Sequence, residues 1–472
     1  MKPLLLCALA LCLSPAHFAA QDRAPLSPDA ARHVSVSAPV VALTHVRLVD
    51  GTGDRARDDQ TIVLRRGRIE VVGPSADVRV PADAVVVELR GHTVIPGLVS
   101  LHEHTWFGGM RRSTHMAVSA PLLYLAMGVT SAMTAGSQFP YAELNLKRSV
   151  DAGVIAGPRF HITGPYLTGG AQRPGVNRIV NSPDEVRRVI AYWAEEGATW
   201  FKFLGGVSHD VLAAGIDEAH ARGLRVTGHL CSITFTEAAR LGIDALQHGF
   251  ITNSDYVPDK QPDVCPPQNM RIQADVDVDS PAVQASIREI VAHRAAVVST
   301  LGVYETFMPT RARLDPGAME MLAADARREV EANHAGLAAS GLVVPDRLLH
   351  KMMAWERAFV AAGGLLGAGS DPWGTGFLPG FGNLRNYELL VEAGFPPELA
   401  IRIMTLNGAI ILGQEQSLGS IAIGKVADLV VIRGDPVRSP ADIYHVVTVF
   451  KDGVGYDSAR LRAAATGRVG VH

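Results

Sequence analysis

Hydrophobic positions in the middle of the chain form short apolar runs, and amphipathic stretches with helical spacing separate them. Runs of this length that end at Gly, Pro or Asp predict buried strands. The predicted strands are Thr93–Val99, Gly128–Met133, Arg159–Thr163, Trp200–Leu204, Arg225–His229, Ala245–His248, Ala296–Thr300 and Leu365–Gly369. Eight strands that alternate with helices over one continuous region favour an α/β fold of the (β/α)₈ TIM-barrel type over an open sheet.

Helix starts are marked by side chains that cap the first turn. Ser182 precedes Pro183 and is followed three residues later by Glu185, which predicts a capped helix start. Ser280 precedes Pro281 in the same way. These signals lie between predicted strands, as the alternating pattern requires.

The segments before and after this alternating region both have strand-like patterns. Residues 41–88 contain short alternating runs that are interrupted by Gly and Asp, and similar runs recur at Ala427–Ile432 and Val446–Phe450. We therefore expect residues 40–92 and 413–458 to form one composite β-sandwich. The barrel would occupy residues 93–412.

The first residues have the pattern of an export signal. Lys2 precedes an apolar run from Pro3 to Ala16, and the small residues Ala19 and Ala20 follow. This predicts a signal peptide over residues 1–20 that is cleaved near Ala20, and a secreted or periplasmic mature protein. Beyond it, no apolar stretch reaches the roughly 18–20 residues that a membrane helix needs, so no membrane anchor is expected.

Composition narrows the class of protein and of partner. The 472 residues include 44 Lys and Arg against 47 Asp and Glu, and 47% are hydrophobic. This apolar content excludes bulk disorder, and the near-neutral charge without basic runs argues against nucleic acid as a partner. A small-molecule substrate is expected, and a homo-oligomer is left open.

Two of the four cysteines would remain after signal cleavage. Cys231 lies two residues beyond His229, and Cys265 lies in a proline-rich loop after His248. Both are expected at the same rim of neighbouring strand–helix units, and an oxidising compartment permits a bridge. We predict a disulfide between Cys231 and Cys265, with two unlinked thiols as the alternative.

Residue types that bind metals recur at the carboxyl ends of the predicted strands, where barrel enzymes place their catalytic groups. They are His102, His104, Lys202, His229, His248 and Asp371. His102 and His104, two residues apart on an extended chain, point to the same face. Lys202 lies in an apolar strand, where an ammonium group is costly unless it is paired or modified.

Two further residues are candidates for contact with a substrate. His161 lies at the end of the third predicted strand, and Tyr304 follows the seventh. Their position at the carboxyl ends of the strands favours a role in substrate binding. The alternative for each is a structural role, in which the side chain packs in the protein or forms a hydrogen bond within it.

Several motifs around these positions resemble the amidohydrolase superfamily, in its imidazolonepropionase-like and metallo-dipeptidase branch. The motifs are Pro96-Gly97-Leu98-Val99 before His102-Glu103-His104, Gly128-Val129-Thr130, Ala219-His220-Ala221-Arg222-Gly223, Gly242-Ile243-Asp244 before His248-Gly249, Thr405-Leu406-Asn407, and Gly419-Ser420-Ile421 leading to Ala427-Asp428. The resemblance covers nearly all of the chain after residue 20.

The resemblance implies two divalent metal ions, with Zn²⁺ as the expected species. One ion would be held by His102, His104 and Asp371, and the other by His229 and His248. Neutral imidazole is a suitable ligand for zinc, which agrees with this assignment.

The resemblance also implies the chemistry. Lys202, carboxylated by carbon dioxide, would bridge the ions, because a carbamate offers two anionic oxygens where an ammonium offers none. A hydroxide between the ions would attack the substrate, and Asp371 would take its proton.

The sequence therefore predicts an exported binuclear metal-dependent hydrolase that cleaves an amide C–N bond, for example in a dipeptide or an N-acyl amino acid. One alternative is a one-metal deaminase or cyclic-amidine hydrolase in which Lys202 is structural. Another is a non-catalytic binding protein on the same fold, although that class would be expected to have lost at least one of the ligand residues.

Overall fold

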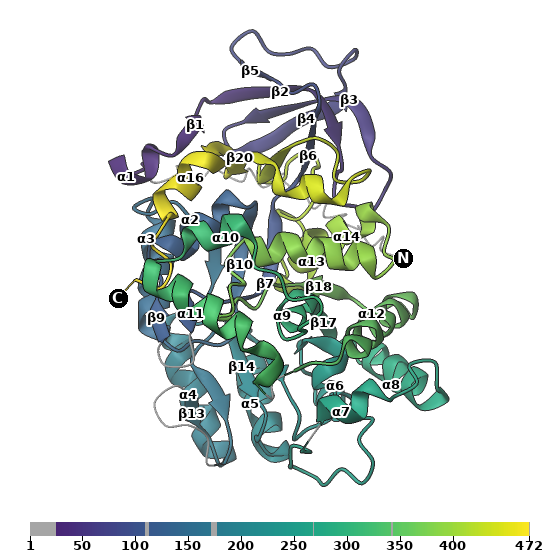
Figure 1. Ribbon diagram of the computed structural model, residues 1–472. Coiled ribbons are helices and arrows are strands. Elements are labelled where there is room, and N and C mark those ends of the chain that lie inside the picture. The colour runs from purple at the N-terminus through teal and green to yellow at the C-terminus, as the bar shows by residue number, and fades with distance from the viewer. Residues whose placement is uncertain (1–24, 109–112, 171–176, 268, 341–342, 472) are drawn as a thin grey trace, which may run out of the picture.

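The computed structural model describes residues 25–108, 113–170, 177–267, 269–340 and 343–471 (Figure 1). A mixed β-sheet lies at one end of the molecule, and parallel strands surrounded by helices make up the rest. The predicted signal peptide, residues 1–20, lies outside the described residues.

The parallel strands fall into two sheets. The smaller has the order β11-β10-β7, and the larger has the order β13-β12-β14-β15-β16-β17-β18. The bounds are β7 (Leu98–Glu103), β10 (Val129–Thr134), β11 (Arg159–His161), β12 (Tyr166–Thr168), β13 (Asn177–Ile179), β14 (Trp200–Leu204), β15 (Arg225–His229), β16 (Ala245–Gln247), β17 (Ala296–Ser299) and β18 (Leu366–Ala368). Apart from β13, which pairs with β12 at the edge of the larger sheet, the order of neighbours follows the order along the chain, as expected for repeated strand–helix units.

The outer strands of the two sheets approach each other at both ends. Past β11, Gly164 N donates to Trp200 O of β14 at 3.2 Å. Past β18, Asp371 N donates to His102 O of β7 at 2.8 Å. Strand pairing itself gives two sheets, so the closed TIM barrel remains a prediction.

Helices lie between and outside these strands (Figure 1). Their bounds are α1 (Pro28–Ala31), α2 (Ser119–Ala126), α3 (Pro140–Asp151), α4 (Pro183–Glu196), α5 (His209–Ala221), α6 (Phe235–Arg240), α7 (Asn269–Ala274), α8 (Pro281–Ala292), α9 (Leu301–Glu305), α10 (Pro316–Met321), α11 (Ala324–Ala335), α12 (Asp346–Ala361), α13 (Phe381–Glu392), α14 (Pro397–Met404), α15 (Leu406–Leu412) and α16 (Ser458–Ala465). The predicted caps are present: Ser182 Oγ accepts from Glu185 N, and Ser280 Oγ accepts from Val283 N.

Strands from both chain ends share one mixed sheet with the order β1-β21-β20-β19-β6-β2-β3-β4, and β5 pairs with β2. The bounds are β1 (Val34–Val36), β2 (Val40–Leu48), β3 (Arg57–Arg65), β4 (Arg68–Pro74), β5 (Val85–Glu88), β6 (His92–Pro96), β19 (Leu429–Arg433), β20 (Val446–Lys451) and β21 (Val454–Asp457). The strands pair as a single nine-stranded sheet. A separation into the two layers of a sandwich therefore remains a prediction.

The predicted first strand, Thr93–Val99, is divided between the two parts of the molecule. Its first half is β6 of the mixed sheet and its second half begins β7 of the parallel sheet. Gly97 lies at the junction, where a Cβ atom would come within 2.1 Å of Thr130 Oγ1. Both strands are buried, so the apolar run continues through the junction and gives no sign of the change of sheet.

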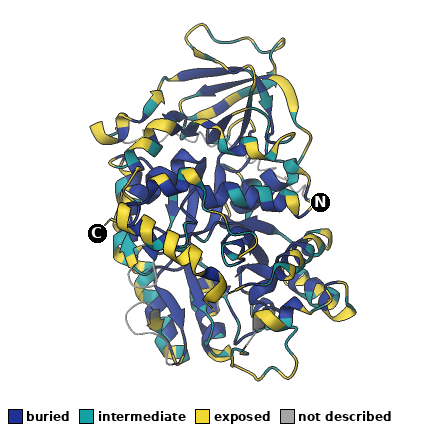
Figure 2. Cartoon of the chain, in the orientation of Figure 1, coloured by how far each residue is buried: buried dark blue, intermediate teal, exposed yellow. Residues whose placement is uncertain are grey.

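Burial follows this arrangement (Figure 2). The parallel strands and the inner faces of the helices are buried, and exposed residues lie on the outer helices and loops. Within the described part of the chain, no helix combines the length and apolar character needed to cross a membrane.

Candidate metal centre

Three predicted ligands meet at the ends of β7 and β18. Potential ligand atoms of His102, His104 and Asp371 all lie within 4.8 Å of one another. Asp371 Oδ1 is 3.0 Å from His104 Nε2 and 3.4 Å from His102 Nε2. The two histidines are only 2% and 3% exposed. His102 lies on β7 and His104 directly follows its end, and a spacing of two residues on an extended chain turns both rings to the same side.

Two further histidines extend this cluster. The ring centroid of His248 lies 4.6 Å from that of His102 and 4.4 Å from that of His229. His248 Nδ1 is 2.8 Å from Thr300 Oγ1, whereas its Nε2 is buried without a hydrogen-bond partner. An orphaned ring nitrogen beside other histidines and a carboxylate is a donor suited to a metal ion.

Lys202 of β14 lines the same cavity and is 1% exposed. Burial lowers the pKa of its amine to about 7, and the charge of Asp371 acts in the opposite direction. Among the described residues, none forms a hydrogen bond or ion pair with its Nζ atom. The structure thus brings all six predicted ligand residues to one cavity.

Burial also sets the charge of the histidines. It lowers the pKa of His229 to about 4 and lowers the pKa of His102 and His248 well below the usual value. For the Asp371 carboxyl, burial raises the pKa, but the neighbouring His102 and His104 outweigh it and hold the pKa well below its usual range. Neutral imidazoles and an ionised carboxylate are the protonation states that bind metal ions.

Gln247, the last residue of β16, orients one of the histidines. Its Oε1 lies 2.6 Å from His102 Nδ1, and its Nε2 donates to Thr227 Oγ1 at 2.7 Å. The amide oxygen accepts from Nδ1–H, so the lone pair of His102 is on Nε2, the atom that faces Asp371. No role was predicted for Gln247 from the sequence. Its position directly before the predicted ligand His248 is the signal that could have indicated one.

Glu103 fixes the position of β7 relative to the segment after β18. Its buried carboxylate accepts from Ser370 N at 3.1 Å, from Ser370 Oγ at 2.6 Å and from Asn383 Nδ2 at 2.7 Å. Burial raises the pKa of this carboxyl, and these hydrogen bonds act against the rise. Glu103 therefore holds the residue next to Asp371 beside the metal-binding histidines.

Aromatic side chains wall the cavity, which has a volume of about 330 Å³. They are Trp106, Tyr166, Tyr304, Phe307 and Trp373. The ring centroid of Tyr304 lies 5.5 Å from that of His248, so this candidate substrate residue faces the cluster. Such a wall limits the entry of water and favours apolar contacts with a ligand.

The other candidate substrate residue lies elsewhere. His161 ends β11 but is absent from the described residues that line this cavity. Its Nε2 is buried without a partner, and burial lowers the pKa of the ring to about 4. His161 lies at the end of a strand, as predicted, but its side chain does not reach the cavity.

Cys231 and Cys265 form a disulfide in the structure. A Cβ atom on Gly205 would lie 2.4 Å from Cys231 Sγ and 2.9 Å from Cys265 Sγ. The turn that follows β14 therefore packs directly against the bridge, and only glycine fits there.

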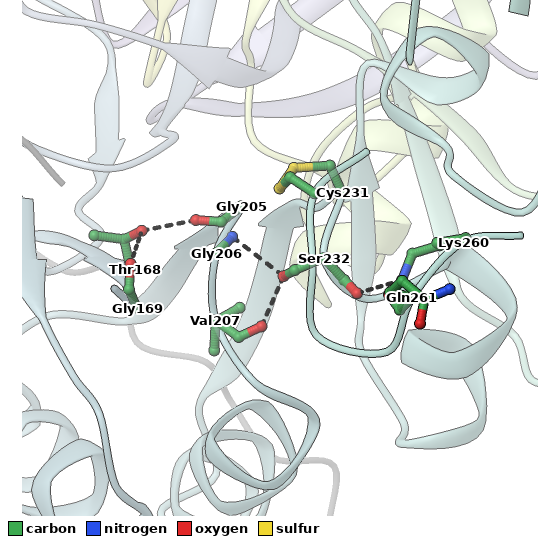
Figure 3. The surroundings of a disulfide bond; sticks show 10 residues. Thr168, Gly169, Gly205, Gly206, Val207, Cys231, Ser232, Lys260 and Gln261 are labelled. Carbon is green, nitrogen blue, oxygen red and sulfur yellow. Dashed lines mark hydrogen bonds between the residues drawn. A yellow bond between two sulfur atoms is a disulfide. The ribbon is translucent and has the colours of Figure 1, made fainter. Parts of the chain in front are cut away.

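Hydrogen bonds tie the same turn to the segment after Cys231 (Figure 3). Ser232 Oγ accepts from Gly206 N at 3.1 Å and donates to Val207 O at 2.7 Å. Lys260 Nζ donates to Ser232 O at 2.6 Å. The disulfide loop and the end of the strand that carries the buried lysine are thus one connected unit.

The sequence profile of the amidohydrolase family matches residues 93–455, which include every residue of the cluster. This chain belongs to the amidohydrolase family. The predicted resemblance to the imidazolonepropionase-like branch is confirmed by curated relatives. An imidazolonepropionase from Micrococcus luteus is 36% identical over 161 residues, which cover 34% of this chain and 37% of the relative.

A deacetylase from Agrobacterium fabrum is 31% identical over 102 residues, which cover 22% of this chain and 24% of the relative. The matches therefore span about a third and about a quarter of these two relatives.

Solved structures match over almost the whole amidohydrolase chain. A proposed prolidase from Bifidobacterium longum is 25% identical, with a TM-score of 0.65 over 90% of this chain and 98% of that one. An Xaa-Pro dipeptidase has a TM-score of 0.65 at 18% identity, over 89% of this chain and 100% of that one. An ochratoxinase from A. niger has a TM-score of 0.65 at 17% identity, over 89% and 96%. The last two show a shared fold alone.

Proposed function

We propose that this amidohydrolase is a metal-dependent hydrolase that cleaves an amide C–N bond. The observation that carries the proposal is the cluster of His102, His104 and Asp371, whose ligand atoms lie within 4.8 Å of one another in a cavity. Neutral histidines and a carboxylate are a donor set that suits Zn²⁺ and similar divalent ions.

The substrate class is supported by the relatives and by the cavity. Similar proteins include an imidazolonepropionase, a deacetylase and a proposed prolidase, and hydrolysis of a C–N bond is compatible with all three names. The cavity of about 330 Å³ suits a small molecule. A dipeptide or an N-acyl amino acid is therefore the proposed substrate.

The second part of the proposal is a centre of two ions. His229 and His248 would hold the second ion, and Lys202 would bridge the pair as a carbamate. The amine nitrogen would attack the carbon of dissolved CO₂, and one N–H proton would pass to solvent. An unprotonated amine is required for this attack, and the burial of Lys202 favours that form.

Bound there, divalent ions would polarise the substrate carbonyl and supply hydroxide near neutral pH. The chain's own groups have separate roles. The Asp371 carboxylate can accept a proton from the nucleophile and return it to the leaving nitrogen. The hydroxyl of Tyr304 stands at the cavity wall, where it can donate to a developing oxyanion. The aromatic side chains restrict bulk water.

One observation favours a second candidate, a one-metal deaminase or cyclic-amidine hydrolase. Within the described residues, the group whose ligand atoms lie mutually close consists of three side chains, His102, His104 and Asp371. That set is sufficient for a single catalytic ion. Lys202 would then serve as a structural residue or as a partner of Asp371.

Metal analysis and a substrate panel test these proposals. The apoprotein is reconstituted with Zn²⁺ and assayed on dipeptides, N-acyl amino acids, cyclic amides and amino-substituted heterocycles, with bound metal counted by mass spectrometry. Two ions per chain and release of an amino acid support the binuclear hydrolase. One ion and release of ammonia support the deaminase. Asp371→Asn should abolish turnover, whereas Asp151→Asn, at an exposed ion pair with Lys147, serves as the matched control.

Location and domain organisation complete the proposal. We infer export through a signal peptide over residues 1–20, a barrel domain over 93–412, and a composite β-domain from 40–92 and 413–458. The composite domain is supported by the mixed sheet, in which β6 pairs with β2 on one side and with β19 on the other. Intact-mass measurement of protein from the natural host tests export, because a mature chain that retains Met1 or Lys2 would contradict it.

A further inference from the structure

A second cavity lies behind one wall of the candidate metal cavity. It has a volume of about 270 Å³, and Phe307 and Trp373 line both cavities. The ring centroids of these two residues lie 5.9 Å apart, and both side chains are half-buried. The two spaces are therefore neighbours, divided by one pair of aromatic rings.

The segments that carry catalytic candidates build this second cavity. Trp373 and Thr375 follow Asp371 on the segment after β18, and Phe307 follows Tyr304 after α9. Leu337, which is 9% exposed, contributes from the segment after α11. A group that extends from a substrate at the metal cluster past this aromatic pair would enter the second cavity.

The described residues that line the second cavity are mostly apolar or neutral polar. Among its described lining residues there is no Asp, Glu, Lys or Arg. Three of its polar side chains have partners: Thr375 Oγ1 donates to Thr306 Oγ1 at 3.3 Å, and His334 Nε2 lies 3.1 Å from Ala312 O. A surface on which aromatic rings and aliphatic carbon predominate selects an apolar group rather than a charged one.

A larger groove beside the metal cavity differs because charged side chains are part of its lining. It has a volume of about 590 Å³ and includes Arg178, Glu185 and Arg188. An apolar group placed there would leave charged side chains desolvated. The comparison therefore favours the uncharged cavity for an apolar substituent.

We propose that the cavity behind Phe307 and Trp373 is a specificity subsite that binds an aromatic or branched apolar group of the substrate. An apolar cavity of about 150 Å³ is already sufficient to hold a benzene ring. The favoured substrates are amides that carry a bulky uncharged side chain, such as N-acyl derivatives of phenylalanine or leucine. This substrate class rests on the proposed amide hydrolysis.

The first test measures binding without catalysis. The probe is 4-fluorotoluene, observed by ¹⁹F NMR on the full chain with and without Zn²⁺. Thr375→Trp fills the subsite from one segment, and Asn333→Trp, an exposed lining residue of α11, fills it from another. Each should weaken probe binding at least about 10-fold, as expected for steric exclusion from an apolar pocket. Thr466→Trp, at an exposed site on a distant helix end, is the matched control.

The second test measures selectivity. The ratio of kcat/KM for N-acetylphenylalanine to that for N-acetylalanine should exceed about 10 in the wild type and fall toward 1 in Thr375→Trp. The metal content of Thr375→Trp should match that of the wild type. Probe binding that is absent in the wild type, or that is as tight in both filling variants as in the wild type, would overturn the subsite. Loss of the probe in the variants together with no amide hydrolysis by any form would instead overturn the proposed function.

Discussion

Gln247 Oε1 lies 2.6 Å from His102 Nδ1, although 145 residues separate the two in the chain. This contact assigns the proton of the imidazole to Nδ1 and leaves Nε2 for a metal ion. Mutation of a residue that hydrogen-bonds to a metal ligand usually lowers metal affinity by about 10–100-fold.

We therefore expect Gln247→Ala to weaken Zn²⁺ binding by about 10–100-fold without unfolding the protein. Competition with a chromophoric chelator measures the affinity. Gln284→Ala, at a partly buried glutamine of α8, provides the comparison. Equal affinity in Gln247→Ala and wild type would show that the contact does not orient the ligand.

Lys202→Ala should lose metal and nearly all activity if the lysine carries a bridging carbamate. The reason is that alanine cannot form the anionic carbamate, whose charge would attract divalent ions by several kcal/mol at about 4 Å in a protein interior. Bicarbonate during reconstitution should speed the recovery of wild type only. Lys147→Ala, which removes an exposed ion pair, is the control. A Lys202→Ala protein with unchanged metal content and normal turnover would show that Lys202 does not bridge the ions.

Glu356 should make stability depend on pH. Burial raises the pKa of this α12 carboxyl to about 8, and the hydrogen bond from Ser299 Oγ at 3.0 Å acts against the rise. The pKa of Glu356 is higher in the folded protein than its value of about 4.5 in the unfolded chain. The protonated carboxyl therefore makes its full contribution to the stability of the folded state below about pH 4.5, and this contribution is lost as the pH rises to about 8. The loss is at most about 1.4 kcal/mol per pH unit in that window.

Glu356→Gln should remove this dependence, because an amide keeps the hydrogen bond and cannot ionise. Denaturant unfolding at pH 5 and pH 8.5 measures it, and the variant should be the more stable protein at pH 8.5 only. Glu331→Gln, at an exposed ion pair on α11, should keep the wild-type profile. A wild-type profile in Glu356→Gln would mean that another group is responsible.

The disulfide should stabilise the rim beside β14. Closure of a loop between positions 34 residues apart is worth about 2–4 kcal/mol. We expect the Cys231→Ser, Cys265→Ser double variant to lose a comparable amount, and reductant to lower the melting temperature of wild type but not of the variant. Alkylation without reductant, followed by peptide mapping, gives the bond directly. Two alkylated thiols in air-purified wild type would contradict it.

Much of the candidate site could be predicted from sequence because its ligands follow local rules. His102, His104 and His229 lie on strands that were recognised from short apolar runs, and the carboxyl ends of parallel strands meet at one edge. The cluster was therefore predictable as soon as the strands were. Helix starts at Ser182 and Ser280 were predictable for the same reason, since a cap is a local interaction.

What was missed depends on contacts between distant segments. Gln247 and Glu103 orient the cluster through hydrogen bonds to residues far along the chain, and no periodicity encodes such partners. His161 was placed correctly at a strand end, but the reach of its side chain is set by tertiary packing. The division at Gly97 was hidden because strands on both sides of it are buried.

The pairing of β6 with β19 has a consequence for how the protein is made. Val94 of β6 pairs with Val431, so the edge of the N-terminal sheet stays open until nearly the whole polypeptide has been synthesised. An unpaired buried strand edge is a template for wrong association. The nascent protein would therefore need protection by chaperones until its last strands arrive, and premature termination before residue 429 would leave an aggregation-prone product.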